Sequence, residues 1–172
     1  DACRNNCTIA ACGDGVRRSD ISDTAHDDYE ACDDGNPNDT DACRNSCASA
    51  FCGDGVRRSD ISDVGDVGFE ACDDGDGNDT NACTTDCAMA RCGDGLTRTD
   101  ISDTTHIDYE ACDDDNEIDA DACRNDCSSA ICGDGVLRVD ITDPSQVDFE
   151  NCEDQNINPN DGCHECRSVD WL

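Results

Sequence analysis

The sequence contains no lysine and very few large apolar side chains. Isoleucine, leucine, valine, phenylalanine, methionine, tryptophan and tyrosine together account for 27 of its 172 residues. So little apolar surface cannot offset the conformational entropy that folding costs, and apolar content and charge alone predict a disordered chain. There is also no apolar run long enough to span a bilayer and no basic-then-apolar signal at the start, so we expect a processed, secreted chain with no membrane span.

Positive charge is scarce as well. Eleven arginines face 36 aspartates and seven glutamates, and the formal net charge is −32. Aspartate suits turns and compact oxygen cages, whereas glutamate favours helices. A chain this acidic is expected to be repelled by nucleic acid and anionic membranes and to attract cations. Divalent metal is therefore the first partner to consider.

Cysteine is abundant, and it changes the prediction of disorder. Eighteen cysteines in 172 residues are typical of a scaffold whose cross-links replace a core. Disulfides persist in oxidising compartments, which predicts an extracellular or cell-surface protein. We expect all of the cysteines to be oxidised, and they are Cys3, Cys7, Cys12, Cys32, Cys43, Cys47, Cys52, Cys72, Cys83, Cys87, Cys92, Cys112, Cys123, Cys127, Cys132, Cys152, Cys163 and Cys166.

The sequence repeats with a period of 40 residues. A fixed period of this size indicates an array in which each copy contacts its neighbours and no global core forms. The predicted fold is a small disulfide-rich repeat array with little regular secondary structure, in which short β-hairpins and helical turns stack into an elongated rod. The divisions are a partial repeat at 1–11, copy one at 12–51, copy two at 52–91, copy three at 92–131, and copy four with a C-terminal tail at 132–172.

Local patterns predict the elements of each copy. The β-branched and aromatic residues of V-R-R-S-D-I-S and D-Y-E-A-C favour one short hairpin, and Asp39 or Thr40 is placed to cap a helical turn that carries Cys43 and Cys47. Cysteines four apart on a helix lie too far from each other to pair. Each is therefore expected to reach the cysteine before G-D-G or before D-D-G, either forward or backward in the sequence.

The direction of pairing decides which cysteines are left over. Backward pairing leaves Cys3 and Cys7, and forward pairing leaves Cys163 and Cys166. In the forward case the shortened C-H-E-C spacing of copy four can close on itself. Both alternatives are compatible with the count.

The succession C-G-D-G, C-D-D-G-N and C-x-x-x-C resembles the disulfide-rich repeat of secreted and surface proteins of myxobacteria and other microbes. The last copy, with C-E-D-Q-N and N-D-G-C, resembles the form of that repeat that ends in G-D-G-C. The resemblance implies a secreted, disulfide-linked surface module. This chain departs from it in one respect, because 19 residues separate Cys12 from Cys32 where the family has about half as many, and the D-I-S-D segment lies in that extra length.

The loop between the second and third cysteines of a copy predicts a calcium site. Asp34, Asn36 and Asn38 follow a D-x-[DN]-x-N spacing that lets alternate oxygens converge on a hard cation. The match to an EF-hand is partial, since the glycine and the final glutamate are absent, and the spacing is closer to the acidic calcium repeats of thrombospondin-type proteins. The alternative is that these side chains cap turns and keep the chain in solution.

A second acidic cluster recurs in the D-I-S-D segment. In copy one Asp20, Asp23 and Glu30 either form another cation site or leave Asp20 to pair with Arg18. The candidate metal ligands of both clusters are Asp20, Asp23, Glu30, Asp33, Asp34, Asn36, Asn38, Asp39, Asp41, Asp60, Asp63, Glu70, Asp73, Asp74, Asp76, Asn78, Asp79, Asp100, Asp103, Glu110, Asp113, Asp114, Asn116, Asp119, Asp121, Asp140, Asp143, Glu150, Asp154, Asn156 and Asp161.

Nothing in the sequence points to catalysis. His26 and His106 are replaced by Asp66 and Gln146 in the other copies, and there is no phosphate loop or nucleophile beside a base. We therefore expect neither an enzyme nor a small-molecule substrate. Zinc at the C-H-E-C segment lacks a fourth ligand. The N-x-[ST] pattern marks three glycosylation candidates, which are Asn6, Asn38 and Asn78.

The sequence thus predicts an extracellular structural protein, stapled by disulfides and stiffened by calcium, that self-associates as the subunit of a surface filament, stalk or sheath. The apolar tail residues Val169, Trp171 and Leu172 are candidates for docking onto a neighbour. The alternative is an adhesin stalk or ligand-binding module of a larger cell-surface protein.

Overall fold

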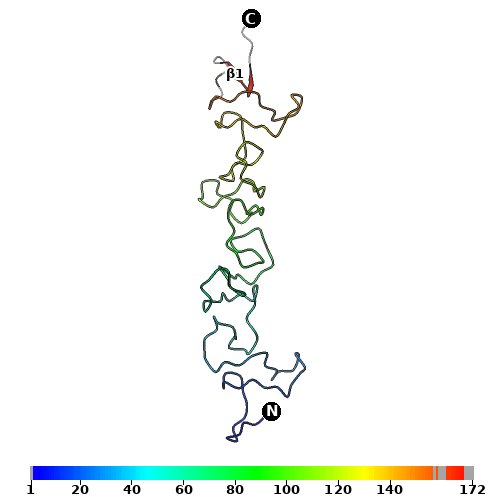
Figure 1. Cartoon of the computed structure of the whole chain (residues 1–172), viewed down its shortest axis with the longest axis vertical. Coiled ribbons are helices and arrows are strands. Elements are labelled where there is room, and N and C mark those ends of the chain that lie inside the picture. The colour runs from blue at the N-terminus through cyan, green and yellow to red at the C-terminus, as the bar shows by residue number, and fades with distance from the viewer. Residues whose placement is uncertain (1, 157, 159–161, 169–172) are drawn as a thin grey trace. The chain divides into compact units, whose positions relative to one another are not determined.

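The computed structural model describes residues 2–156, 158 and 162–168. Asp161, a predicted metal ligand, and the apolar tail, a predicted docking segment, lie outside these residues. The chain divides into two compact units, one of Asp1–Asn78 with Cys83–Met89 and the other of Asp79–Ala82 with Ala90–Leu172. Each unit is built from loops, and Figure 1 shows no coiled ribbon in the described chain.

Regular secondary structure in the described residues is limited to one hairpin. Strand β1 (Cys163–His164) pairs antiparallel with β2 (Arg167–Ser168), in the register Cys163 to Ser168 and His164 to Arg167. The two residues between them, Glu165 and Cys166, both have positive φ, at 49° and 55°. This is the geometry of the two-residue hairpin turn whose twist matches that of its strands.

The other C-x-x-x-C segments form a related but longer turn, which we call the cysteine hairpin. In copy one an isolated bridge joins Cys43 to Ser49, the N–H of Cys47 donates to the carbonyl of Arg44 at 2.7 Å, and Cys47 has φ 58°. A type I turn followed by one left-handed residue is the common three-residue hairpin loop. The predicted helical turn at residues 39–47 is therefore wrong, and the missing residue of C-H-E-C explains the shorter turn of copy four.

Disulfide pairing runs backward in the sequence. In the described part of the chain, eight disulfides join each cysteine hairpin to the two preceding cysteines of its own copy. The longer bridges are Cys12–Cys47, Cys52–Cys87, Cys92–Cys127 and Cys132–Cys166. The shorter bridges, all with a separation of 11 residues, are Cys32–Cys43, Cys72–Cys83, Cys112–Cys123 and Cys152–Cys163.

This pairing settles two of the open alternatives. Cys163 and Cys166 each reach an earlier cysteine, so the C-H-E-C segment does not close on itself. Cys3 and Cys7 are the two cysteines outside the eight bridges, as backward pairing requires, and Cys7 has an exposed thiol. The predicted disulfide-rich character, with little regular secondary structure, is confirmed.

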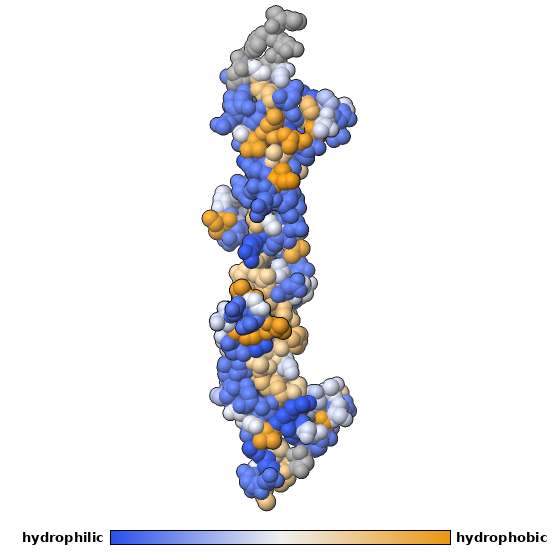
Figure 2. Space-filling view, in the orientation of Figure 1, coloured by the Kyte–Doolittle hydropathy of each residue, from blue (hydrophilic) through white to orange (hydrophobic). Residues whose placement is uncertain are grey.

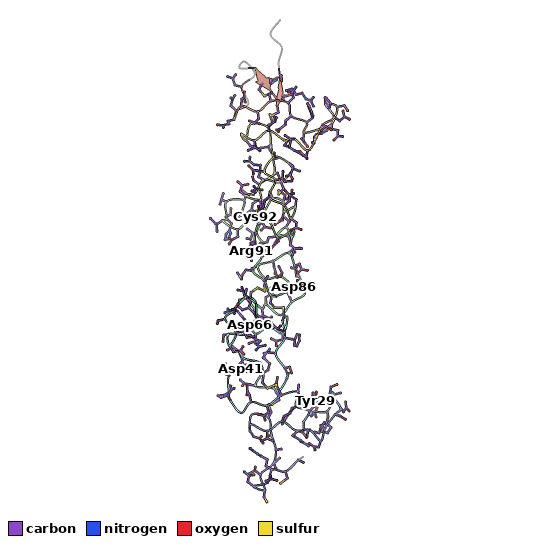
Figure 3. All side chains as sticks on the ribbon, in the orientation of Figure 1. Tyr29, Asp41, Asp66, Asp86, Arg91 and Cys92 are labelled. Atoms are coloured by element: carbon purple, nitrogen blue, oxygen red, sulfur yellow. A yellow bond between two sulfur atoms is a disulfide. The ribbon has the colours of Figure 1, made fainter. Side chains whose placement is uncertain are left out.

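Sulfur makes up most of the small buried core. Among the described residues the buried apolar side chains are Ala10, Cys43, Cys47, Cys83, Cys87, Cys123, Cys127, Cys163 and Cys166. Large apolar side chains lie outside, with Val67 and Ile107 at 98% and 93% exposure, and in Figure 2 the orange residues form separate small groups among blue ones. Because so few apolar side chains are buried, cross-links, more than apolar packing, must hold each copy. Figure 3 draws the side chains of the described residues, with sulfur in yellow.

The hairpin predicted from V-R-R-S-D-I-S and D-Y-E-A-C does not form strands. The hydrogen bonds that join the two segments of copy one involve side chains, because Nε of Arg17 donates to the carbonyl of Glu30 and the N–H of Arg18 donates to the Glu30 carboxylate. Among the described residues no helix is long and apolar enough to cross a membrane.

Candidate functional site

The C-G-D-G loop of each copy forms a cradle of backbone N–H groups. In copy one Gly13 and Gly15 have φ of 87° and 82°, values that a side chain would disfavour. The N–H groups of Gly13 and Asp14 donate to Oδ2 of Asp33 at 3.1 and 3.2 Å, and those of Gly15 and Gly35 donate to Oδ1 at 2.8 and 3.0 Å. Successive N–H groups that converge in this way form an anion-binding nest, and here the anion is the protein's own carboxylate.

The nest recurs in every copy. Asp73 and Asp113 accept the same four N–H groups of their copies, and Glu153 in copy four accepts those of Gly133 and Gln155 at 2.8 and 2.7 Å. Burial disfavours the charged form of Asp113, but the backbone donors outweigh it and hold its pKa below the ordinary value. The pKa of Asp33 is lowered by the same balance.

The loops that form the nest approach each other closely. A Cβ on Gly35 would lie 2.8 Å from the Cα of Gly15, and Gly75 meets Gly55 in the same way. Copies three and four have Asp115 and Gln155 at this place, with φ of 58° and 63°. Glycine therefore suits this position for both backbone conformation and space, and the last two copies hold non-glycine residues in a left-handed conformation instead.

A buried glutamate lies next to each nest. Glu30 is 3% exposed, and its Oε2 accepts the backbone N–H of Arg18 at 2.6 Å. The equivalent glutamates bind the equivalent arginine N–H groups, and they are Glu70, Glu110 and Glu150. Burial raises the pKa of Glu110, while the Arg98 N–H opposes that rise.

The glutamate and the nest carboxylate come together with the longer disulfide. Single oxygens of Glu30 and Asp33 and the sulfur of Cys47 lie within 4.8 Å of one another. The corresponding groups are Glu70, Asp73 and Cys87; Glu110, Asp113 and Cys127; and, in copy four, Glu153 with the sulfurs of Cys132 and Cys166. Each sulfur is part of a disulfide and is not a thiolate ligand, so the oxygens are the only ligands these groups can offer a hard cation.

The aspartate that opens the D-I-S-D segment is paired with arginine. Arg18 Nη2 lies 3.0 Å from Asp20 Oδ2, and the hydrogen bonds from the guanidinium lower the pKa of Asp20 to about 2. The matching pairs are Arg58–Asp60, Arg98–Asp100 and Arg138–Asp140. Of the two predictions for Asp20, ion pairing with Arg18 is the one that the structure contains.

The second aspartate of the D-I-S-D segment closes a local turn. Asp23 Oδ1 accepts the N–H of Ala25 at 3.0 Å, and Asp103 accepts both the N–H and the hydroxyl of Thr105. Asp63 and Asp143 bind the residues two positions after them in the same way. These aspartates do not belong to the carboxylate groups that meet at the nests of the described chain.

The predicted calcium loop is a ladder of side-chain turns. Oδ1 of Asp34, Asn36 and Asn38 each accepts the N–H two residues later, at 3.2, 2.7 and 3.2 Å. The Asn36 amide also donates to Asp41 at 3.1 Å. The alternating side chains that were predicted to converge on a cation thus bind the backbone of their own loop. Among the described residues, no backbone N–H donates to the second oxygen of Asp34.

The same ladder appears in the other copies with local changes. Asp74 and Asp76 support copy two, Asn116 and Asp121 support copy three, and Asp154 and Asn156 support copy four. Asp114 is exposed, Asn78 donates its N–H to Asp76, and Asp161 lies outside the described residues.

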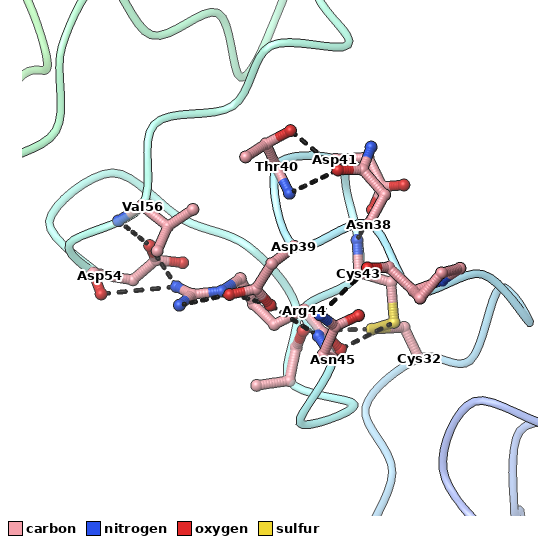
Figure 4. A network of polar contacts seen from close by, with 12 residues as sticks. Cys32, Asn38, Asp39, Thr40, Asp41, Cys43, Arg44, Asn45, Asp54 and Val56 are labelled. Carbon is pink, nitrogen blue, oxygen red and sulfur yellow. Dashed lines mark hydrogen bonds and ion pairs between the residues drawn. A yellow bond between two sulfur atoms is a disulfide. The ribbon is translucent and has the colours of Figure 1, made fainter.

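An arginine between two aspartates links one copy to the start of the next. Arg44 lies 3.2 Å from Asp39 and 2.6 Å from Asp54, and Asp54 also accepts the N–H of Val56 (Figure 4). The N–H of Phe51 donates to Asp54 as well. Within the second compact unit Arg124 contacts Asp119 and Asp134 in the same way, at 3.0 and 3.1 Å.

Sequence reasoning missed this junction and the nest. The signal for the junction was present, because C-R-N precedes G-D-G by a constant interval in several copies, with Thr84 in place of arginine in copy two. The signal for the nest was the invariable G-D-G followed by C-D-D or C-E-D. In the sequence both patterns look like ordinary turn residues, because only the structure shows which backbone N–H groups the carboxylates accept.

Two of the three glycosylation candidates lie in such turns. Asn6 and Asn38 each accept the N–H and hydroxyl of the threonine two residues later. Modification of these three asparagines stays a prediction.

The molecule therefore offers two kinds of oxygen site. The first is the paired carboxylates beside the nests of copies one to three, and the second is the loop oxygens around Asp34 and Asp41. Neither contains a nucleophile beside a base. Comparison with known proteins returns no match, whether to a family model, to a curated protein or to a solved structure.

Proposed function

We propose that this chain is an extracellular structural repeat protein, the subunit of a surface filament, stalk or sheath. The observation that supports it is the recurrence of one cross-linked design, in which two nested disulfides, a carboxylate nest and an arginine–aspartate pair return at 40-residue steps. Polar groups in each copy are committed to the protein's own backbone. Such an arrangement suits a mechanical role, because each copy is stabilised by itself and by its neighbours.

The oxidising location is part of this proposal. Eight disulfides in a chain of this size are typical of proteins in secreted or extracellular environments. Reduction would remove most of the buried core, since that core consists largely of cystine sulfur.

Calcium binding completes the proposal. Carboxylate oxygens of Glu30 and Asp33 lie within 4.8 Å, where two full charges repel by about 3–4 kcal/mol at an effective dielectric constant of 20. A hard divalent cation reverses the sign of that interaction, and it accepts carboxylate and amide oxygens of the kind that Asp34, Asn36 and Asp41 present. The net charge of −32 adds a general attraction for cations.

The calcium part is tested by thermal unfolding at constant ionic strength. We expect the melting temperature to fall when a chelator removes calcium and to recover with calcium more than with equal magnesium, which holds its waters more firmly. Equal melting temperatures under all three conditions would exclude a structural calcium ion.

The polymer part is tested by electron microscopy and sedimentation of the purified protein across a concentration series. Ordered polymers that grow with concentration are the expected result. A monomer at every concentration, with calcium present, would contradict the role of filament subunit.

A second candidate function, a binding module in a cell-surface stalk, is favoured by one observation. Val67, Ile107 and Val147 occupy matching places in three copies and are 98%, 93% and 82% exposed. Exposed β-branched side chains at a regular interval suit a repeated contact with a partner. A monomer that binds a surface partner, and loses that binding when these residues become serine, would support this function instead.

A further inference from the structure

A pocket with two apolar walls lies at the start of copy four, and we call it the copy-four pocket. Its volume is about 350 Å³, and the residues that line it include Ile131, Asp148, Phe149, Glu165 and Arg167. All of them belong to the second compact unit. Ile131 is 64% exposed and Phe149 is half-buried. A ligand in the pocket would therefore remove apolar surface from water.

Arg167 gives this pocket a wall that the other copies lack. It follows the shortened C-H-E-C hairpin, and alanine or serine occupies its place in copies one to three. Its Nη1 donates to the carbonyl of Pro144 at 2.8 Å, and its Cζ lies 5.4 Å from the centre of the Phe149 ring. Arg167 thus covers one face of the ring and connects the hairpin to the loop at 144–149.

A buried carboxylate also lines the pocket. Glu150 is 7% exposed, and its Oε2 accepts the N–H of Arg138 at 2.9 Å. Among the described residues no hydrogen-bond donor reaches its other oxygen. In copies one to three the equivalent glutamate belongs to the group at the nest, whereas the group of copy four contains Glu153 and two sulfurs. A buried carboxylate with an unpaired oxygen is costly, so a cation in the pocket would be stabilised by Glu150.

Two exposed carboxylates add to this negative charge. Asp148 and Glu165 form no ion pair or hydrogen bond in the described part of the chain. The guanidinium of Arg138 pairs with Asp140, and that of Arg167 donates to backbone carbonyls. The pocket therefore has three carboxylates against one lining guanidinium, and it attracts positive charge.

These walls suit a cation on an apolar stem. An ammonium group is compact and has three donors, so it can reach carboxylate oxygens that do not share one plane. Its alkyl stem would pack against Ile131 and Phe149 while the charged end stays beside the carboxylates. A lysine side chain has this form, and the present chain contains no lysine.

Exposed apolar residues extend the contact surface beyond one side chain. Leu137 is 39% exposed and adjoins the Arg138 N–H that binds Glu150, while arginine or threonine occupies its place in the other copies. Val147 is 82% exposed and follows Gln146, whose carbonyl accepts a hydrogen bond from Arg167. A free amine would leave these side chains in water, whereas a polypeptide would cover them.

We propose that the copy-four pocket binds a lysine side chain presented by a partner protein, with apolar residues beside the lysine that cover Leu137 and Val147. The binding does not depend on calcium or on filament formation. A second copy of this chain does not supply the occupant, because it has no lysine.

The test measures fluorescence anisotropy of an end-capped, labelled peptide that has one lysine between two leucines. It is titrated with the full chain, disulfides intact, at physiological salt and with a chelator present. The first control peptide has norleucine in place of lysine, which keeps the stem and removes the charge. The second control is competition by capped lysine amide, which separates a free amine from a lysine flanked by apolar residues.

Two protein variants separate the pocket from the general attraction of an acidic chain for cations. Glu165→Gln removes a carboxylate of the pocket, and Glu117→Gln removes one from an exposed residue of copy three. The two variants have the same net charge. Any difference between them in binding therefore reports the place of the carboxylate.

We expect the lysine peptide to bind at least about tenfold more tightly than the norleucine peptide, and more tightly than capped lysine amide. Glu165→Gln should weaken its binding about three- to fivefold, and Glu117→Gln by less than about 1.5-fold. Equal affinities of the two peptides, or equal effects of the two substitutions, would overturn the proposal. It would also be overturned by capped lysine amide that binds as tightly as the peptide, or by binding that requires deletion of residues 169–172, which would make the tail the occupant.

Discussion

Asp113 and Gly95 are joined across 18 residues by a hydrogen bond of 2.8 Å from the glycine N–H to the carboxylate. Three further N–H groups, from Gly93, Asp94 and Asp115, reach the same side chain. One carboxylate thus fixes the C-G-D-G loop to the C-D-D segment, in the place where a larger protein would use apolar packing. Charge-assisted hydrogen bonds of this kind are about twice as strong as neutral ones.

Asp113→Asn should destabilise the folded chain by about 1–3 kcal/mol, because an amide has one acceptor oxygen and its NH2 group would face backbone donors. The measurement is urea unfolding followed by circular dichroism, in the presence of chelator. Asp114→Asn is the matched control, since Asp114 is exposed and adjacent, and it should change stability by less than about 0.5 kcal/mol. Equal effects of the two substitutions would show that the nest does not stabilise the fold.

Arg124→Ala should lower the free energy of unfolding by about 1–3 kcal/mol, because it leaves the partly buried Asp134 without its cation. The side chains of Arg124 and Asp134 are 18% and 13% exposed. The control is Arg91→Ala, as Arg91 is exposed and forms no ion pair in the part of the chain that the structure describes. If calorimetry finds the same melting temperature for both variants, the arginine at the junction contributes only surface charge.

The cross-links and the repeat were predictable because both follow from composition and spacing. Eighteen cysteines at fixed intervals require cystine bridges when apolar residues are this few. The direction of pairing was not predictable, since Cys43 lies within reach of either neighbouring half in sequence, and only the folded hairpin decides that it bonds to Cys32.

The helical turn was predicted wrongly because capping signals are ambiguous in short loops. Asp39 was assigned to a helix N-terminus, but its carboxylate binds Arg44 and the N–H of Asn45. Aspartate and asparagine favour local side-chain turns as readily as helix caps. The disulfides of Cys43 and Cys47, four residues apart, also restrict the backbone between them. Local side-chain turns of this kind also form the Asp34 loop, where Oδ1 of Asp34, Asn36 and Asn38 each accepts the N–H two residues later.

Removal of the longer disulfide should destabilise copy three more than removal of the shorter one. Cys92→Ser with Cys127→Ser opens a separation of 35 residues, and Cys112→Ser with Cys123→Ser opens one of 11. Loop-closure entropy predicts costs of about 3.8 and 2.8 kcal/mol respectively, and the nesting of one bridge in the other reduces that difference. Unfolding in guanidinium would measure it, and a larger effect of the shorter bridge would contradict an entropic origin.

Stability should fall when the pH decreases below about 4. Backbone donors outweigh burial and lower the pKa values of Asp33, Asp113 and Asp134 in the folded protein, so the unfolded chain takes up protons first and gains population as pH falls. The stabilisation from these groups is therefore complete above their unfolded pKa of roughly 3.9 and is lost as pH falls through the lower folded values. Glu110 has the opposite sign, because its raised pKa favours the folded state while it is protonated and that contribution is lost as the pH rises.

Calorimetric melting temperatures between pH 7 and pH 2, with chelator present, measure this balance. Because at least three aspartates have lowered pKa values and one glutamate has a raised pKa, the melting temperature should be higher at pH 6 than at pH 2. The decrease should be smaller in Asp113→Asn, because that variant has lost one of the groups whose protonation unfolds the chain. A melting temperature that is constant down to pH 2, or an equal decrease in the variant, would mean that the nest carboxylates titrate alike in the folded and unfolded chains, and the backbone cradle would then contribute nothing to stability.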